Sequence, residues 1–360
     1  MQTWTFRAID SWFFRDGTPF HSGETAGLHH RSMFPPPISA IQGAIRTTLA
    51  RSRGWTERDK TDIYWPKELG DYESLGELSF RGPYLRWRNE RLYPIPLTLI
   101  GDRKRVNHRL IPSYSTVSCD MGNVRLVEIP DRKKGKLLTG WVNKEGMQQI
   151  LAGGFLKESQ IYLPSELYQS EFRIGLQRDN HTLQANEGYL YSSVHVRPYL
   201  EVRIEVEVTG IPSDWKVANN QLIPFGGEGR FADVEVTESK TERIVMPLDR
   251  LENSDPVRFY MSLLTPGVFA DVKKTIERGP LADLSCVSGS ISRVVSQGSW
   301  DQKHNMPRKN LLMIPAGSTW FYETDQHMLE TIQTLHHSKI GNRTEYGYGE
   351  IAIGRWTAKK

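Results

Sequence analysis

The chain has 360 residues, of which 38% are hydrophobic and 24% are charged, and its formal net charge is +4. This composition excludes a disordered or fibrous chain and fits a soluble globular protein, and the length suits two domains better than one. Cys119 and Cys286 lack the spacing of a disulfide framework or a zinc site. No apolar run reaches membrane-spanning length, so we expect a cytoplasmic protein. We also expect it to hold no cofactor and no metal.

Basic residues are concentrated in one stretch. Between Arg103 and Lys136, nine Lys or Arg residues stand against three acidic ones, which gives a net charge of +6. Such a run is typical of a solvated face or a mobile loop, and contact with phosphates is the alternative.

The first expected element is a half-buried strand. Residues 3–9 alternate apolar and polar side chains, with Trp4, Phe6 and Ala8 on one face. This period of two is that of a strand with one face in a core.

A helix is expected within residues 34–54. Apolar side chains recur there at helical spacing at Ile38, Ile41 and Ile45. Ser39 and Gln42, three residues apart, predict a capping box at its start. Arg46 and Arg53 are seven residues apart, so they would share a separate basic face.

The next part of the chain combines one helix with several strands. The helix is expected to begin at the cap residue Asn143 and to stop at Gly153-Gly154. Strand patterns follow at 172–176 and 189–197, and the clearest is at 200–208, where branched apolar and charged residues alternate. A joint between domains is expected near 211–215.

The second half likewise combines strand patterns with a helix pattern. A helix is expected after Asp325, with Gly341 as the residue that ends it, and a last strand at 350–356. The other expected strands are at 231–236, 244–248, 257–264, 284–296 and 311–322.

Each half therefore predicts an α+β layer with helices on one face of a sheet. We place the first domain at 1–212, with a basic insertion at about 55–140, and the second at 213–360. No close sequence repeat relates the halves.

Motifs of common catalytic sites are mostly missing, since the chain has no GxxxxGK[ST], HExxH or GxSxG sequence. His21, His29 and His30 lie in one short polar segment. A metal-independent ribonuclease needs a general base and a general acid, and histidine suits both tasks. Surface or packing histidines, and RNA contact without catalysis, are the alternatives.

Two glycine-rich stretches raise the question of phosphate binding. In IGNRTEYGYGE (340–350), three glycines can offer backbone N–H groups to a phosphate, Arg343 adds charge, and Tyr346 and Tyr348 offer faces for stacking. In PFGGEGRFADVEV (224–236), no Lys-Ser/Thr follows, which argues against a nucleotide loop. For the first stretch, loop geometry is the alternative to phosphate binding. The second stretch is either a glycine bend that opens a strand or a contact with RNA or another subunit, and Arg230 could pair with Glu228 or reach RNA.

Several stretches together resemble one family. FFRDGTPF, FPPPISAIQGAIRT, RIGLQRDNHTLQANEGYLYSSVHVRP, PFGGEGRFADVEV, LLTPGVF and GYGEIAIGRW come in the order seen in subunit three of the Cmr complex, the type III-B CRISPR effector of the RAMP superfamily. The resemblance extends from Phe13 to Trp356. Thr18 departs from it, because the family commonly has arginine in FRDGxPF.

The resemblance implies two ferredoxin-like (RRM-type) domains with insertions. It also implies a non-catalytic subunit that grips the 5′ handle of the crRNA and docks the large palm-domain subunit and the first RAMP backbone subunit, with target RNA as a further partner and no membrane contact. On this interpretation the expected RNA-binding residues are Arg15, His21, His29, His30, Arg31, Arg46, Arg178, Arg230, Gly341, Arg343, Gly347, Tyr348 and Gly349.

Three other functions are weighed against this one. The main alternative is a metal-independent, repeat-processing endoribonuclease of the same superfamily that uses His29 and His30. The matching subunit of the Csm-type complex would not be expected to carry FRDG followed by FPPP. A scaffold without RNA contact is the last.

Overall fold

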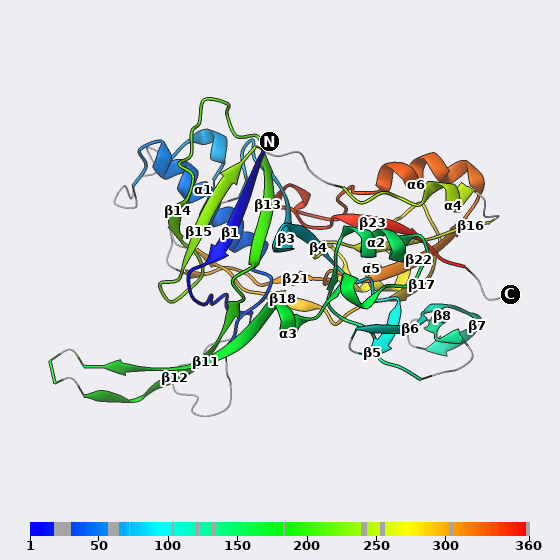
Figure 1. Cartoon of the computed structure of the whole chain (residues 1–360), viewed down its shortest axis with the longest axis horizontal. Coiled ribbons are helices and arrows are strands. Elements are labelled where there is room, and N and C mark those ends of the chain that lie inside the picture. Colours follow the sequence, from blue (N-terminus) through cyan, green and yellow to red (C-terminus); the bar gives the residue numbers. More distant parts are fainter. Residues whose placement is uncertain are drawn as a thin grey trace. The chain divides into compact units, whose positions relative to one another are not determined.

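The computed structural model describes residues 1–17, 30–56, 65–71, 73–102, 104–119, 122–130, 134–179, 181–182, 184–238, 243–252, 256–301 and 306–357. Two compact units are built from interleaved segments (Figure 1). The first contains Met1–Pro83, Leu167–Ser239 and Ser296–Leu311, and the second contains Tyr84–Glu166, Lys240–Val295 and Leu312–Lys360. The boundary expected after residue 212 divides the chain differently, and the two ferredoxin-like domains stay a prediction.

The first unit is built on an antiparallel sheet around β1 (Gln2–Ala8), as the alternation at 3–9 predicts. β1 pairs with β13 (Val202–Thr209) on one side and with β15 (Phe231–Thr237) on the other. The sheet continues to β14 (Gln221–Pro224) beyond β15 and to β3 (Ser79–Trp87) beyond β13, and β3 then runs into the second unit.

Strand β13 confirms the strand predicted at 200–208. Its residues Ile204 and Val208, on the apolar face, are fully buried. Glu205 and Glu207 alternate with them and are also buried, at 1% and 3% exposed. The strand is therefore covered on both faces.

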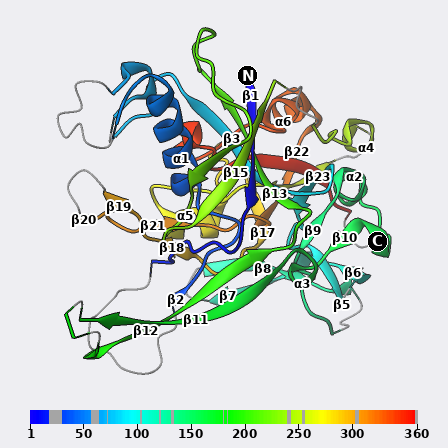
Figure 2. The same ribbon diagram turned by 60° about the vertical axis from the view of Figure 1, so that its left-hand side comes forward.

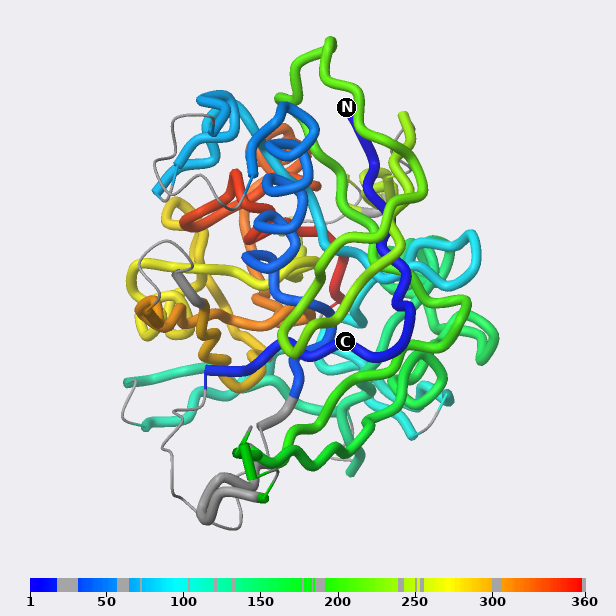
Figure 3. The backbone as a smooth tube through the Cα atoms, turned by 90° about the vertical axis from the view of Figure 1, so that its left-hand side faces the viewer, coloured from blue at the N-terminus to red at the C-terminus, as the bar shows by residue number. Residues whose placement is uncertain are grey.

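Helix α1 (Ile38–Ser52) confirms the helix expected within 34–54, with the isoleucines at helical spacing buried. It lies beside β14 (Figure 3). The predicted capping box is wrong, because the helix begins after Pro37 without a side-chain cap. The Ser39 hydroxyl instead accepts a hydrogen bond from the Gln297 amide at 2.7 Å.

A long hairpin, β11 (Tyr168–Arg178) with β12 (Ala185–Pro198), belongs to the first unit and extends beyond its body (Figures 1 and 2). β2 (His30–Arg31) adds a short parallel strand to β12. The strands expected at 172–176 and 189–197 are thus the two arms of one hairpin. The unit also contains a 3-10 turn at Lys67–Leu69 and the pair β19 (Trp300–Asp301) and β20 (Met306–Pro307).

The second unit contains a four-stranded antiparallel sheet in the order β17 (Cys286–Ser290), β22 (Thr319–Thr324), β16 (Val257–Leu263), β23 (Ile351–Arg355). β23 confirms the last predicted strand. Alternate residues of β16 enter different cores: Phe259 and Met261 pack with the helical residue Ile332, whereas Tyr260 packs with Met147 and Ile150. Helices thus cover both faces of this sheet.

The helices of this unit are short. α2 (Lys144–Leu151) begins where predicted, because the Asn143 side chain accepts a hydrogen bond from the Gly146 N–H at 3.0 Å. α6 (Leu329–Leu335) ends earlier than predicted, and the left-handed residue after it is His337 (φ 62°), not Gly341. The remaining helices are α3 (Pro164–Leu167, at the junction with the first unit), α4 (Leu248–Glu252) and α5 (Val272–Arg278).

The basic insertion forms ribbons in the second unit. β5 (Leu99–Asp102) pairs with β6 (Arg105–Arg109), and β7 (Ile111–Cys119) pairs with β8 (Gly122–Glu128). The mobile-loop interpretation of this stretch is therefore wrong for its described residues. The other short strands are β4 (Glu90–Pro94), β9 (Trp141–Val142), β10 (Ile161–Tyr162), β18 (Val295–Gln297) and β21 (Leu311–Met313).

Two adjacent histidines after α6 are bound differently. The Nδ1 atom of His336 accepts from the Ile353 N–H and its Nε2 donates to the Ile244 carbonyl, each at 3.1 Å, so the ring is neutral. His337 directs Nε2 at the same carbonyl and Nδ1 at Glu350, so both of its nitrogens face acceptors. Burial, with the neighbouring His337, lowers the pKa of His336 to about 4.

Stability should therefore depend on pH through His336. The unfolded chain binds a proton here below pH ~6.5, whereas the folded chain does so only below about 4. The free energy of unfolding is expected to rise with pH across this window by on the order of 3 kcal/mol. Urea unfolding at pH 5, 6 and 7 measures it. His336→Gln should flatten the profile and His181→Gln, at an exposed position, should not; parallel profiles for all three proteins would contradict the assignment.

Candidate nucleic-acid interface

The base of the β11–β12 hairpin holds a cluster of charged side chains around Asp10, which follows β1. Asp10 accepts from Arg197 at 2.5 Å, from Arg173 at 3.0 Å and from Arg230 at 3.1 Å. Glu171 also accepts from Arg173 and Arg197, at 2.7 and 2.6 Å. We call these five residues the Asp10 cluster.

The hairpin register explains why these side chains meet. Glu171 lies opposite His195, and Arg173 lies opposite Ser193, so alternate residues of both strands share one face. Arg197 continues that face on β12. On the other face, β11 presents three exposed apolar side chains: Phe172 at 53%, Ile174 at 63% and Leu176 at 53%.

Electrostatics hold the cluster ionised. Burial would raise the pKa of Asp10, but hydrogen bonds and charge from Arg173 and Arg197 outweigh it and lower that pKa below its usual range. The same two arginines lower the pKa of Glu171 against the effect of burial. Three guanidinium groups against two carboxylates leave the cluster with one excess positive charge. Its side chains are 19–40% exposed, so the cluster is open to solvent.

The glycine-rich bend at 226–229 packs beside this cluster. Gly226 has a left-handed φ of 91°, and a Cβ there would stand 2.9 Å from the Phe13 carbonyl oxygen. The Gly227 N–H donates to that same oxygen at 2.8 Å. The glycines therefore let the bend approach the FFRDG segment. Glu228 does not pair with Arg230 as considered above: it binds His195, while Arg230 binds Asp10.

His195 joins the bend to the hairpin. It is fully buried, stacks on the Phe13 ring at 5.0 Å, and contacts the Glu228 carboxylate through Nε2 at 2.8 Å. Burial lowers its pKa, against the raising effect of Glu228. The Ser11 hydroxyl lies 3.2 Å from Nδ1, but Ser11 is only 1% exposed. A serine closed off from solvent cannot attack a substrate, so this trio is a packing arrangement.

The N-terminal residues expected to bind RNA lie only partly within the described chain. His21 and His29 lie outside the described residues. His30 and Arg31 form β2, beside Ser193 and Val194 of the hairpin, and only their backbone is described. Arg15 is exposed and forms a bridge with Ser32. The backbone thus brings part of the predicted segment to the hairpin that carries the cluster.

Arg46 was expected to face RNA, but its side chain is engaged within the chain. It donates to the carbonyl oxygens of Leu69 at 2.9 Å, Asp71 at 2.5 Å and Ser74 at 3.3 Å. Its guanidinium also lies over the Trp65 ring. Arg46 therefore fastens a loop to α1. Arg178, at the end of β11, is exposed.

The glycines of the 340–350 segment are required by the conformation and close packing of the backbone. Gly341 and Gly349 have left-handed φ values, and a Cβ would stand 2.4 Å from the Val268 oxygen or 1.9 Å from the Ile340 oxygen, respectively. The N–H of Gly347 donates to Thr344 and that of Gly349 to Pro266. Two of the three amides expected to bind phosphate are therefore already used.

The other residues of this segment divide between core and surface. Tyr348 is 2% exposed, so its ring offers no face to a base in this structure. Glu350 is 1% exposed and binds His337 and the Tyr84 hydroxyl. Arg343 is exposed and stands over the Tyr346 ring at 5.8 Å. Arg343 thus keeps the exposed arrangement expected of an RNA contact, whereas Tyr348 does not.

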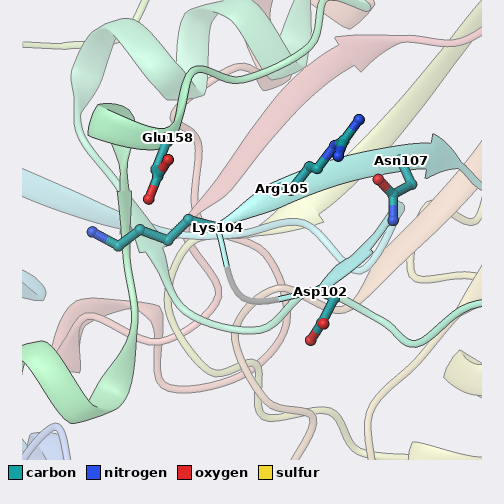
Figure 4. A pocket seen from close by; sticks show the side chains of 5 residues that line it. All are labelled: Asp102, Lys104, Arg105, Asn107 and Glu158. Carbon is teal, nitrogen blue, oxygen red and sulfur yellow. The ribbon is translucent and has the colours of Figure 1, made fainter.

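A surface pocket in the second unit is lined by Asp102, Lys104, Arg105, Asn107 and Glu158 (Figure 4). Its charges are mixed, and Lys104 forms an ion pair with Glu166 at 2.6 Å. The side chains in Figure 4 do not converge on one point, so the pocket has no defined ligand chemistry. Over the described ranges, no group of three His, Cys, Asp or Glu residues is arranged to hold a metal ion. No helix in that same part of the chain is long and apolar enough to cross a membrane.

Comparison with known proteins identifies the family. Residues 4–356 match the family described as CRISPR-associated protein (Cas_Cmr3). The chain belongs to this family. The match confirms the resemblance drawn from the FRDG, FPPP and GYGE stretches.

Solved structures agree with the Cas_Cmr3 assignment at the level of fold. The chain is similar to one in the cryo-EM structure of the Type III-B Cmr-beta bound to cognate target RNA and AMPPnP, with a TM-score of 0.56, 16% identity and 99% of each chain covered. The same values hold for Cmr-beta bound to cognate target RNA. No curated protein sequence matches the chain. The fold of this Cas_Cmr3 member is thus a strand-rich mixture of helix and sheet, as in those Cmr chains.

Sequence reasoning missed most of the Asp10 cluster. Asp10, Glu171, Arg173 and Arg197 are not among the residues expected to bind RNA. Only Arg230 was among the expected RNA contacts. The alternation of Arg173 with the apolar residues Phe172 and Ile174 was the available signal, because in a strand it places the charge on a separate face.

The cluster predicts an energetic coupling between Asp10 and Arg230. Asp10→Asn should lower the free energy of unfolding by about 1–2 kcal/mol, because it leaves the partly buried Arg230 without its carboxylate partner. Arg230→Gln should lower it by about 1 kcal/mol, because Asp10 loses one of its three arginine partners. The double variant should cost less than the sum by roughly 1 kcal/mol. Urea unfolding of the four proteins measures this. Asp214→Asn at an exposed position of the same unit is the control, and additive losses would show that the pair does not interact.

Proposed function

We propose that the chain is a non-catalytic, RNA-binding subunit of a type III-B CRISPR effector complex that grips the 5′ handle of the crRNA. The observation that carries this proposal is the Asp10 cluster, in which three arginines meet at the base of a hairpin in a member of the Cas_Cmr3 family. The similar chains of Cmr-beta come from a complex bound to cognate target RNA, which supports an RNA-bound setting.

The chemistry of the cluster suits an RNA backbone. A guanidinium has five N–H donors, and its fork geometry matches a phosphate. Asp10 and Glu171 use some of these donors and hold Arg173 and Arg197 in fixed positions. Guanidiniums that are already ordered lose little conformational freedom when a phosphate arrives, so preorganisation favours binding.

Neighbouring residues would extend the RNA path in the first unit. We propose that Arg15, His30 and Arg31 line it on one side, because β2 pairs with the hairpin strand that carries Arg197. Arg178 would contact RNA further along the hairpin. Phosphate contacts would supply affinity, and splayed handle bases would supply recognition.

The proposal gives the chain no catalytic role. The trio of Ser11, His195 and Glu228 has a buried serine, as described above. Docking to the large palm-domain subunit and to the first RAMP backbone subunit, in the cytoplasm, completes the proposed role.

The salt dependence of handle binding tests this function. Arg173→Gln with Arg197→Gln should weaken binding of a 5′-handle RNA about tenfold at physiological salt. The slope of log K against log salt should lose about 0.7 for each phosphate contact on a single strand. Fluorescence anisotropy of labelled handle RNA with the full chain measures both quantities.

The matched control removes two exposed lysines from the second unit, Lys273→Gln with Lys274→Gln. It lowers the net charge equally, so a general electrostatic effect would appear in both variants. A slope that is unchanged in the arginine variant, or changed equally in the control, would remove the cluster from the RNA path.

A further inference from the structure

The ribbon β7–β8 in the second unit displays an aromatic side chain and an arginine together. Tyr114 is 63% exposed, and the Arg125 guanidinium lies 5.9 Å from the centre of its ring. The pair comes from the basic stretch at 103–136, for which neither the fold nor the proposed grip on the handle gives a role.

The backbone holds this pair in place. The Nε of Arg125 donates to the Ser113 carbonyl at 2.6 Å, next to Tyr114 in the chain. The Ser288 hydroxyl of β17 donates to the Arg125 carbonyl at 2.6 Å and so ties the ribbon to the sheet of the same unit. The arginine is fixed before any ligand arrives.

The face that carries Arg125 is polar along its length. Thr116 lies opposite Arg125, and Ser118 lies opposite Asn123, so these four side chains share one face. Thr116, Ser118 and Asn123 are exposed and can donate and accept hydrogen bonds. The opposite face differs, because Val117 and Leu126 are apolar and 45% and 51% exposed.

The surrounding insertion adds positive charge. Arg105, Lys134 and Lys136 are exposed. Other basic residues of the stretch act within the chain: Arg109 donates to the Ile150 and Gly154 carbonyls, and Lys104 pairs with Glu166. The charge that remains on the surface favours a polyanion.

We propose that the polar face of the β7–β8 ribbon is a second RNA-binding site, on which one base of a single strand stacks on Tyr114 while Arg125 contacts its phosphate. An aromatic platform beside a fixed cation matches single-stranded nucleic acid, whose bases stack without regard to sequence. The hydroxyl groups of Thr116 and Ser118 supply hydrogen-bond partners for the 2′-hydroxyl groups of RNA. The site is separate from the Asp10 cluster and extends the proposed function.

The test uses the full chain and a labelled oligouridylate of fifteen nucleotides, with anisotropy as the readout. Tyr114→Ala should weaken binding about tenfold with an unchanged salt slope, since stacking releases no counterions. Tyr114→Phe keeps the ring and should bind as the natural chain does. Arg125→Gln should reduce the salt slope by about 0.7.

Leu126→Ser, on the opposite face of the same ribbon, is the control and should bind normally. Equal weakening by Leu126→Ser and Tyr114→Ala, or equal weakness of the Ala and Phe variants, would overturn the proposal. Thermal unfolding confirms that each exposed substitution leaves the chain folded. A parallel measurement separates this site from the Asp10 cluster. Adding Tyr114→Ala to the Arg173→Gln, Arg197→Gln variant should weaken binding by the same factor as adding it to the natural chain.

Two further experiments distinguish whether the single-stranded RNA bound at this site is the guide or the target. In the assembled complex, Tyr114→Ala should weaken retention of the guide RNA if the ribbon holds the guide. It should weaken capture of a complementary target instead if the ribbon holds the target. Loss of subunit assembly with normal retention of both RNAs would show a protein-binding face and refute the RNA site.

Discussion

One carboxylate, that of Asp10, organises the side of the first unit for which we propose RNA binding. It receives Arg173, Arg197 and Arg230, which lie 163 to 220 residues further along the chain. Three guanidiniums brought together without an anion would repel one another, so a carboxylate among them is required. Because Asp10 follows β1, the central strand of the sheet, the hairpin and the glycine bend are fixed to the core through this residue. The positions of the proposed RNA contacts follow from that constraint.

The two glycine-rich stretches show why a motif cannot be interpreted from glycine spacing alone. Gly226 and Gly349 each lack room for a Cβ because a backbone oxygen lies against them. A phosphate-binding loop also requires residues without a side chain. A glycine that packs against backbone and a glycine that binds phosphate therefore look the same in the sequence. What separates them is where the neighbouring N–H groups point. In this chain the amides of Gly227, Gly347 and Gly349 donate to backbone carbonyls.

Patterns within a short stretch of sequence correctly predicted several helices and strands. The alternation around Trp4, the helical spacing after Pro37 and the cap at Asn143 each produced the expected element. The burial of Glu205 and Glu207 did not follow from the pattern, since alternation along one strand does not show what packs on its second face. The end of α6 differed for a similar reason: the bonds of His337 to Ile244 and Glu350 stabilise a left-handed residue where glycine was expected.

The site was harder to predict than the fold, because it joins residues that no motif connects. A lone aspartate after a strand carries no signal, and Arg46 appears as suitable for RNA contact as Arg197 until their partners are known. Resemblance to the Cmr subunit supplied the function class, and the structure moved the proposed contacts from α1 and the glycine amides to the hairpin base. That move depends on hydrogen-bond partners, which a single sequence does not contain.

Photocrosslinking in the assembled complex tests the central claim most directly. A guide RNA with 4-thiouridine in its 5′ handle would be irradiated in the complex, and the attached peptides of this chain identified by mass spectrometry. Our account predicts crosslinks in peptides that contain Arg173, Arg197 or Arg230, at the base of the β11–β12 hairpin. Crosslinks confined to α1 around Arg46, with none at the hairpin base, would contradict it.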